Sequence, residues 1–217
     1  QIVDEAYAGR LHVDGKLIVP VEEGPAKQRR KLSYVGAVFV SLALNSKHEL
    51  AGDIQLVTDG IPAGLDDDLL RAQNRKYDRI LDQIGNGCDV LEIGCGWGGF
   101  AEYAAGKRGL RVTGLTISQA QHDYAVERIK RAGLSDRVEI KLQDYRDEKG
   151  VYDGIASIEM FEAVGEKYWP VYFDVVMARL RPGARATLQI ITMQDARFEV
   201  YRKSVDFIQK YIFPGGM

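Results

Sequence analysis

Residues 89–100 read D-V-L-E-I-G-C-G-W-G-G-F, and this stretch decides the fold. The apolar residues Val90, Leu91 and Ile93 predict a buried strand, which then breaks into four closely spaced glycines. Glycine lets a backbone turn through positive φ, and it lets a ligand approach where a Cβ atom would block it. A helical pattern follows, so we expect a strand, a tight turn and a helix start whose unpaired N–H groups can meet a ligand.

The glycine spacing fits two kinds of cofactor. Gly94, Gly96 and Gly99 satisfy G-x-G-x-x-G, but the dinucleotide fingerprint also needs an acid about 20 residues further on. Residues 112–116 read V-T-G-L-T and offer no carboxylate. Acid-x-Gly-x-Gly-x-Gly instead resembles the pattern of S-adenosylmethionine-dependent methyltransferases, so we favour that cofactor over NAD or a turn without any ligand. The expected cofactor-binding residues in this stretch are Glu92, Gly94, Gly96 and Gly98.

The composition is that of an ordinary globular protein. The 217 residues are 46% hydrophobic and 28% charged, and the net charge of −2 argues against a nucleic-acid partner. Cys88 and Cys95 form neither C-x-x-C nor a disulfide framework, which predicts a cytoplasmic protein. No apolar run reaches the ~18 residues that a membrane-spanning helix needs, and no group of residues has metal-ligand spacing.

The chain divides into two parts. Residues 1–64 form a smaller N-terminal region of uncertain fold, and residues 65–217 form the cofactor-binding domain. Within the first part, residues 10–19 predict two short strands around an Asp-Gly turn. The apolar stretch 34–44 is too short to span a membrane, and we expect a buried segment rather than one that dips into a membrane.

Helical and strand patterns alternate over the second part. A helix opened by the acids at 66–68 should end at Gly85, and Ser118 should cap the helix after the second strand. Alternation at this pitch predicts an α/β fold with a doubly wound, mostly parallel sheet, whose ligands bind outside the carboxyl ends of the strands. After the first strand, the expected strands are 111–115, 137–142, 152–158 and 185–191, and the expected helices are 118–131 and 167–180.

Polar residues follow three of these strands. Thr116 and Gln121 come after the second strand. After the third, Asp144 can accept a hydrogen bond from an adenine amino group while Tyr145 packs on the ring, the alternative being a solvated loop aspartate. Glu162 follows the fourth strand among apolar neighbours, and burial there would raise its pKa and suit it to proton chemistry. A solvated loop glutamate is the alternative reading of Glu162.

Six stretches resemble one family, the cyclopropane fatty acid synthases and their close methyltransferase relatives. They occur in order and at family spacing from about residue 66 to the end, and together they are highly specific. The stretches are A-Q-N-R-K-Y-D-R-I (72–80), V-L-E-I-G-C-G-W-G-G-F (90–100), V-T-G-L-T-I-S-Q-A-Q (112–121), L-Q-D-Y-R-D (142–147), S-I-E-M-F-E-A-V-G (157–165) and Y-I-F-P-G-G-M (211–217).

The resemblance implies a class I methyltransferase-like Rossmann fold that binds S-adenosylmethionine. The implied reaction is transfer of a methyl or methylene group to the cis double bond of unsaturated phospholipid acyl chains, by a cytoplasmic protein peripheral to the inner face of the membrane. Thr116 and Gln121 match residues that the family places after the second strand. Glu162 matches a glutamate that helps to hold an active-site bicarbonate, the base of the reaction. The resemblance leaves a homodimer open as the assembly.

Three departures from the family pattern concern the substrate side. The upstream segments H-Y-D-x-G-N and Y-S-C-A-Y-F are not recognisable, although Tyr34, Ala37 and Phe39 echo the second. Gln189 stands where many members have a histidine. No antiparallel strand pair is readable after Ile191, so we expect these 217 residues to be part of a longer functional polypeptide. The alternatives are a small-molecule or branch-forming methyltransferase on the same fold, and a catalytically inactive cofactor-binding partner protein.

Overall fold

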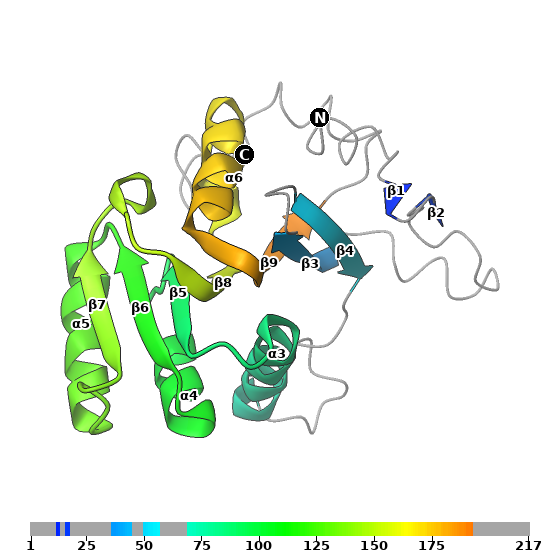
Figure 1. Cartoon of the computed structure of the whole chain (residues 1–217). Helices are drawn as coiled ribbons and strands as arrows, with labels where there is room; N and C mark the ends of the chain where they lie inside the picture. Colours follow the sequence, from blue (N-terminus) through cyan, green and yellow to red (C-terminus); the bar gives the residue numbers. More distant parts are fainter. Residues whose placement is uncertain (1–11, 14–15, 18–35, 45–49, 57–68, 193–217) are drawn as a thin grey trace.

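The computed structural model describes residues 12–13, 16–17, 36–44, 50–56 and 69–192, and their arrangement is shown in Figure 1. The acidic helix start expected at 66–68 and the Y-I-F-P-G-G-M stretch lie outside these residues.

Five strands of the central sheet run parallel to one another, as the alternating pattern predicted. The sheet has seven strands in the order β4-β3-β9-β8-β5-β6-β7. The neighbours β9-β8, β8-β5, β5-β6 and β6-β7 pair in parallel. The chain order reverses between β5 and β8, and ligands of open α/β sheets bind at such a switch point. The parallel strands are β5 (Asp89–Ile93), β6 (Arg111–Thr116), β7 (Val138–Leu142), β8 (Tyr152–Ile158) and β9 (Leu180–Thr192).

Antiparallel strands from the first part of the chain extend the sheet beyond β9. β3 (Gly36–Leu44) pairs antiparallel with β9 on one side and with β4 (Leu50–Leu56) on the other. Residues 36–44 of the apolar stretch 34–44 therefore supply an inner strand of the sheet. The two short strands expected within residues 10–19 are confirmed as β1 (His12–Val13) and β2 (Lys16–Leu17), which pair antiparallel, while the Asp-Gly turn itself lies outside the described residues.

Helices cover both faces of the parallel strands (Figure 1). One core joins α3, α4 and α5 to one face of the sheet, and the other core joins α6 to the opposite face. Short 3-10 turns follow β7 and β8. The elements are α3 (Leu69–Ile84), α4 (Gly99–Arg108), α5 (Gln119–Arg131), α6 (Trp169–Arg179), η1 (Tyr145–Asp147), η2 (Phe161–Ala163) and η3 (Glu166–Tyr168).

The strand β5 is buried on both faces, which explains its nearly continuous apolar sequence. Val90 packs in the core under α3, α4 and α5, while Leu91 and Ile93 pack in the core under α6. Because side chains alternate along a strand, Glu92 points to the same face as Val90. A carboxyl group is thus placed between the sheet and the helices that flank its carboxyl edge.

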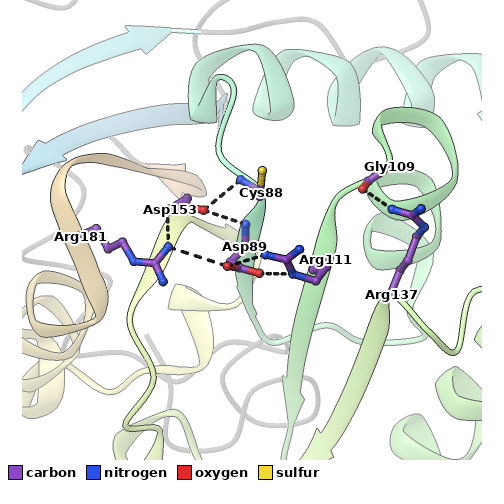
Figure 2. Close-up of polar contacts among 7 residues, drawn as sticks. All are labelled: Cys88, Asp89, Gly109, Arg111, Arg137, Asp153 and Arg181. Carbon is purple, nitrogen blue, oxygen red and sulfur yellow. Dashed lines mark hydrogen bonds and ion pairs between the residues drawn. The ribbon is translucent and has the colours of Figure 1, made fainter.

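Helix ends follow the residue chemistry expected from the sequence. Ser118 Oγ accepts a hydrogen bond from the Gln121 N–H at 3.4 Å, which confirms the predicted N-cap of α5. Gly109 ends α4 in the left-handed conformation at φ 66°. Arg137 donates to the Gly109 carbonyl at 2.7 Å, a contact drawn in Figure 2.

A network of charged residues ties four strands together at the amino edge of the sheet (Figure 2). Asp153 Oδ2 accepts from the N–H groups of Cys88 and Asp89, each at 3.0 Å. Arg181 pairs with Asp153, and Arg111 holds both carboxylate oxygens of Asp89 at 2.6 and 2.9 Å. These contacts connect β5, β6, β8 and β9 at the end of the sheet opposite the glycine turn.

Two glycine substitutions should change stability in opposite directions. A Cβ at Gly154 would lie 2.2 Å from Ile84 Cγ2, so Gly154→Ala should lower the free energy of unfolding by about 1–3 kcal/mol through overpacking. A Cβ at Gly106, inside α4, would meet Leu134 Cδ1 at an ordinary 3.7 Å. Gly106→Ala should therefore raise the free energy of unfolding by about 0.5–1 kcal/mol. Urea titrations of both variants test this pair, and equal effects would contradict the packing of α3 on β8.

The Asp153 network predicts an acid-sensitive contribution to stability. The Asp89 N–H and Arg181 lower the pKa of Asp153 below its ordinary value of 3.8. A carboxylate with a depressed folded-state pKa stabilises the fold above its unfolded-state pKa, and the contribution is lost as the pH falls through the folded-state value. Asp153→Asn should therefore destabilise the protein at neutral pH and lose less stability than the parent between about pH 5 and pH 3.

Urea unfolding at each pH measures the Asp153 effect. Asp136→Asn is the control because this aspartate is 74% exposed. If the free energy of unfolding changed with pH in the same way in the parent and in Asp153→Asn, the role given to Asp153 would be contradicted.

Candidate active site

The turn after β5 is built from left-handed glycines. Gly94, Gly96 and Gly98 have φ values of 79°, 52° and 77°. The N–H groups of Gly94 and Cys95 both donate to the Leu115 carbonyl, at 3.0 and 2.8 Å. The turn is therefore fastened to the end of β6, and non-glycine residues would be strained at all three positions.

The space around the glycines differs from one position to the next. A Cβ at Gly94 would lie 2.4 Å from Met160 Cγ, and one at Gly98 would lie 3.0 Å from the Ala125 Cβ. A Cβ at Gly96 would meet no atom within 4 Å. Gly94 and Gly98 are thus required by packing, while Gly96 borders open space that a ligand can enter.

Glu92 is buried beneath this turn. Its side chain is 2% exposed, and burial raises its pKa well above the ordinary value. The N–H of Ala101, in the first turn of α4, bonds to the carboxyl group, so Glu92 supplies the helix cap that Gly98 lacks a side chain to provide. Among the residues that the structure describes, Glu92 Oε2 has no hydrogen-bond partner. One oxygen thus holds the helix start, and the other can form a hydrogen bond with a ligand.

Thr116 and Gln121 meet at the end of β6, as their placement after the second strand predicted. Thr116 Oγ1 donates to Gln121 Oε1 at 2.8 Å and accepts from the Ser118 N–H at 3.1 Å. The Gln143 N–H donates to the Thr116 carbonyl at 2.9 Å and joins the end of β7 to the same place. Contact of this pair with a cofactor stays a prediction.

Asp144 is already engaged by a side chain that the sequence analysis overlooked. Arg146 binds both oxygens of the Asp144 carboxylate, through Nε at 2.9 Å and Nη2 at 2.6 Å, and it lowers the pKa of that group. The Tyr145 ring packs edge-on against Tyr172, with centroids 5.5 Å apart. An adenine contact at Asp144 and Tyr145 stays a prediction, and an adenine amino group would have to share the carboxylate with Arg146. The Asp-x-Arg spacing is the signal that could have indicated this pair.

Glu162 lies in η2 and is 7% exposed, which confirms the burial expected from its apolar neighbours. Burial raises the pKa of the Tyr172 hydroxyl, and the nearby charge of Glu162 acts weakly in the same direction. The neighbouring Phe161 belongs to the core, with its ring 5.1 Å from that of Tyr172. Glu162 is therefore a carboxyl group in an aromatic setting at the carboxyl edge of the sheet.

Sequence reasoning missed Lys76 and the role of Glu159. Lys76 is 9% exposed on the inward side of α3, and its Nζ lies 3.8 Å from Glu159 Oε1. The signal was available in the sequence, because Lys76 occupies the same four-residue stripe as Ala72 and Ile80.

The site is assigned to the carboxyl edge although a hollow exists at the other edge. That hollow, of about 320 Å³, lies at the amino ends of β5, β6 and β7 and includes Asp89, Arg111 and Arg137 among its lining residues. In open α/β sheets ligands bind outside the carboxyl ends, where Gly96 borders open space. The amino-edge hollow lies among the ion pairs that tie the strands together.

Comparison with known sequences finds a match over most of the chain. A family model described as mycolic acid cyclopropane synthetase matches residues 63–217. Tuberculostearic acid methyltransferase UfaA1 of Mycobacterium tuberculosis is 47% identical over 152 residues, which is 69% of this chain and 35% of that protein. Cyclopropane-fatty-acyl-phospholipid synthase of Escherichia coli is 42% identical over 152 residues, 69% of this chain and 38% of that protein. This chain thus spans little more than a third of these relatives.

Solved structures of similar fold include two cyclopropane synthases. MmaA2 from Mycobacterium tuberculosis matches with a TM-score of 0.63 and 26% identity, over 71% of this chain and 58% of that one. CmaA1 complexed with SAH and CTAB matches with a TM-score of 0.58 and 26% identity, over 70% and 57% of the two chains. These likenesses confirm the predicted doubly wound sheet of the class I methyltransferase type.

Gly96 offers a direct test of cofactor binding at the glycine turn. Gly96→Val should abolish binding of S-adenosylhomocysteine, because a branched side chain at φ 52° would fill the open space and resist the turn. Gly133→Val is the matched control, since Gly133 also has a positive φ, 68°, and open surroundings, but follows α5. Titration calorimetry measures both variants. Undiminished affinity in Gly96→Val, or equal loss in both, would remove the assignment.

Proposed function

The chain belongs to the mycolic acid cyclopropane synthetase family, and from that premise we propose that it takes part in S-adenosylmethionine-dependent transfer of a methyl or methylene group to the double bond of a fatty acyl chain. The observation that carries the proposal is the glycine turn, open at Gly96, on the same edge of the sheet as the buried carboxyl of Glu162. The turn residues Glu92, Gly94, Gly96 and Gly98, with Thr116 and Gln121, would hold the cofactor.

The proposed reaction mainly requires that the two reactants are positioned against each other and that water is excluded. The cofactor supplies a methyl group on a positively charged sulfur, and an alkene is a weak nucleophile that must be placed against it. Positive charge then develops on the lipid chain. Glu162, buried beside Tyr172 and Phe161, is suited to counter that charge and to take or relay a proton from the new methyl group.

A bicarbonate bound near Glu162 as the immediate base is part of the proposal. The family resemblance supports it through Glu162, while Gln189 replaces the histidine found in many members. The amide of a glutamine can donate a hydrogen bond to such an anion and can accept one from its O–H group, but it cannot exchange a proton with it at neutral pH. Any proton removed from the lipid would therefore go to the bicarbonate or to the Glu162 carboxylate, and not to Gln189.

The lipid substrate and its product are the finer parts of the proposal. The name of the Escherichia coli relative supports an unsaturated phospholipid acyl chain and a cyclopropane product. The name of the Mycobacterium tuberculosis relative, a methyltransferase at 47% identity, favours a second candidate that leaves a methylene or methyl branch. A small-molecule methyltransferase or an inactive cofactor-binding partner has no comparable support.

We place the encounter with the lipid at the membrane surface. Within the part of the chain that the structure describes, no helix is both long and apolar enough to cross a bilayer. A peripheral position at the cytoplasmic face would let the carboxyl edge of the sheet reach an acyl chain. Homodimer formation is the proposed assembly, to be tested by the mass in solution.

Labelled S-adenosylmethionine and vesicles of unsaturated phospholipid test the function. The expected result is label in the lipid, and label confined to small molecules or absent would contradict the proposal. The products differ chemically: a ring and a methylene branch have the same mass, but only the methylene branch reacts with ozone. A saturated methyl branch is two hydrogens heavier and requires a reductant in the assay.

Glu162→Gln tests the carboxyl group while keeping the side-chain shape. Turnover should fall by about 100-fold or more, as expected for loss of a positioned acid–base or charge-stabilising group. Affinity for S-adenosylhomocysteine should stay close to that of the parent. Glu139→Gln, on the edge strand β7 with a 68% exposed side chain, is the control. A parental rate for Glu162→Gln would retire the assignment, and a loss of cofactor affinity alone would make Glu162 a binding residue.

A further inference from the structure

A lysine lies on the buried stripe of α3 near the proposed site. Ala72, Lys76, Ile80 and Ile84 recur at four-residue intervals and all face inward. Burial lowers the pKa of Lys76, and the charge of Glu159 acts in the opposite direction. A buried ammonium is costly unless it is paired, and Lys76 Nζ has Glu159 Oε1 as its ion-pair partner at 3.8 Å. An apolar residue would fill this place without that cost, so the presence of the pair suggests a function.

Glu159 carries a strained backbone. Its φ is 51°, and among the residues that the structure describes it is the one non-glycine with positive φ. Such a conformation is strained and persists where surrounding contacts enforce it, often at functional sites. The Glu159 N–H donates to the Gln189 carbonyl at 3.0 Å, which holds the end of β8 against β9.

The same glutamate sets the orientation of the Gln189 side chain. Gln189 Nε2 donates to Glu159 Oε1 at 2.8 Å. An ionised carboxylate can only accept hydrogen bonds, so the amide must turn its NH₂ group toward Glu159 and its carbonyl oxygen away. Gln189 is 5% exposed, and Gln189 Oε1 has no donor among the described residues.

Other buried oxygens on this face also lack a hydrogen-bond partner among the described residues. Glu92, Ala156 and Thr187 are neighbours across β5, β8 and β9, so their side chains share one face of the sheet with Gln189. Within the described part of the chain, Glu92 Oε2 and Thr187 Oγ1 have no hydrogen-bond partner. Buried polar atoms are nearly always paired, so these neighbouring oxygens indicate that water or a polar ligand lies against this face.

We propose that Lys76 and Glu159 are positioning residues for Gln189: they hold its amide so that the carbonyl oxygen is presented to the methyl-transfer site. The proposal rests on the function proposed above. A carbonyl oxygen stabilises developing positive charge on the lipid chain but does not keep a proton, whereas a histidine at this place could do both. The two residues would therefore have separate roles: Gln189 stabilises the cation, and the carboxylate of Glu162 takes part in the proton transfer.

Glu159→Gly separates positioning from structure because glycine relieves the strain at φ 51°. The melting temperature should change little, because relief of the strain at φ 51° offsets the loss of the Lys76 partner. Affinity for S-adenosylhomocysteine should stay within about twofold, and turnover at saturating lipid should fall by about 10-fold or more. Glu159→Gln, whose amide no longer forces one orientation, should fall between the parent and Glu159→Gly. Lys76→Met should also lower turnover.

Glu139→Gly is the matched control for the backbone effect. Glu139 lies inside β7 with a negative φ, so the same substitution should lower the melting temperature and leave turnover unchanged. Parental turnover in Glu159→Gly would overturn the proposal. So would lost turnover accompanied by a lower melting temperature or lost cofactor affinity, since a purely structural role predicts that combination.

A readout independent of catalysis separates this inference from the proposed function. The side-chain NH₂ signal of Gln189, identified by its absence in Gln189→Met, should be shifted and slow to exchange in the parent. It should become ordinary in Glu159→Gly. If the parent labels no lipid, the proposed function fails while this signal still decides the orientation of Gln189. If lipid is labelled and the signal is the same in both proteins, the positioning role fails alone.

Discussion

The left-handed turn after β5 is the constraint on which the rest of the site depends. Gly94, Gly96 and Gly98 all have positive φ, and neighbouring side chains fill the places that a Cβ would take at the first and third. This geometry lets two successive N–H groups reach the carbonyl of Leu115. The strand end, the start of α4 and the end of β6 are therefore held together, with Glu92 beneath them as the helix cap.

Charge is handled differently at the two edges of the sheet. At the amino edge, Arg111 and Arg181 meet Asp89 and Asp153 in partly exposed pairs that tie the strands together. At the carboxyl edge, Glu92 and Lys76 are buried, which costs stability because desolvation disfavours their charged forms. Groups perturbed in this way concentrate where chemistry is done, which agrees with the assignment of the site to the carboxyl edge.

Much of the fold was predictable because its signals are local. Apolar runs marked β5 and β8, Ser118 marked the start of α5, and Gly85 marked the end of α3. Thr116 and Gln121 lie at the end of β6, the strand that they were expected to follow, and the burial of Glu162 followed from its apolar neighbours. Parallel strands end at one edge, so residues after different strands converge without any knowledge of their contacts.

The sequence by itself determined the order and type of the elements, the glycine turn and the edge at which polar residues gather, because each depends on neighbouring residues in the chain. Only the tertiary structure decided that β3 pairs with β9, that Arg146 takes the Asp144 carboxylate, and that Lys76 meets Glu159. These facts depend on register and on the approach of separate elements. Periodicity reports which face of an element is buried, but not which atoms that face will meet.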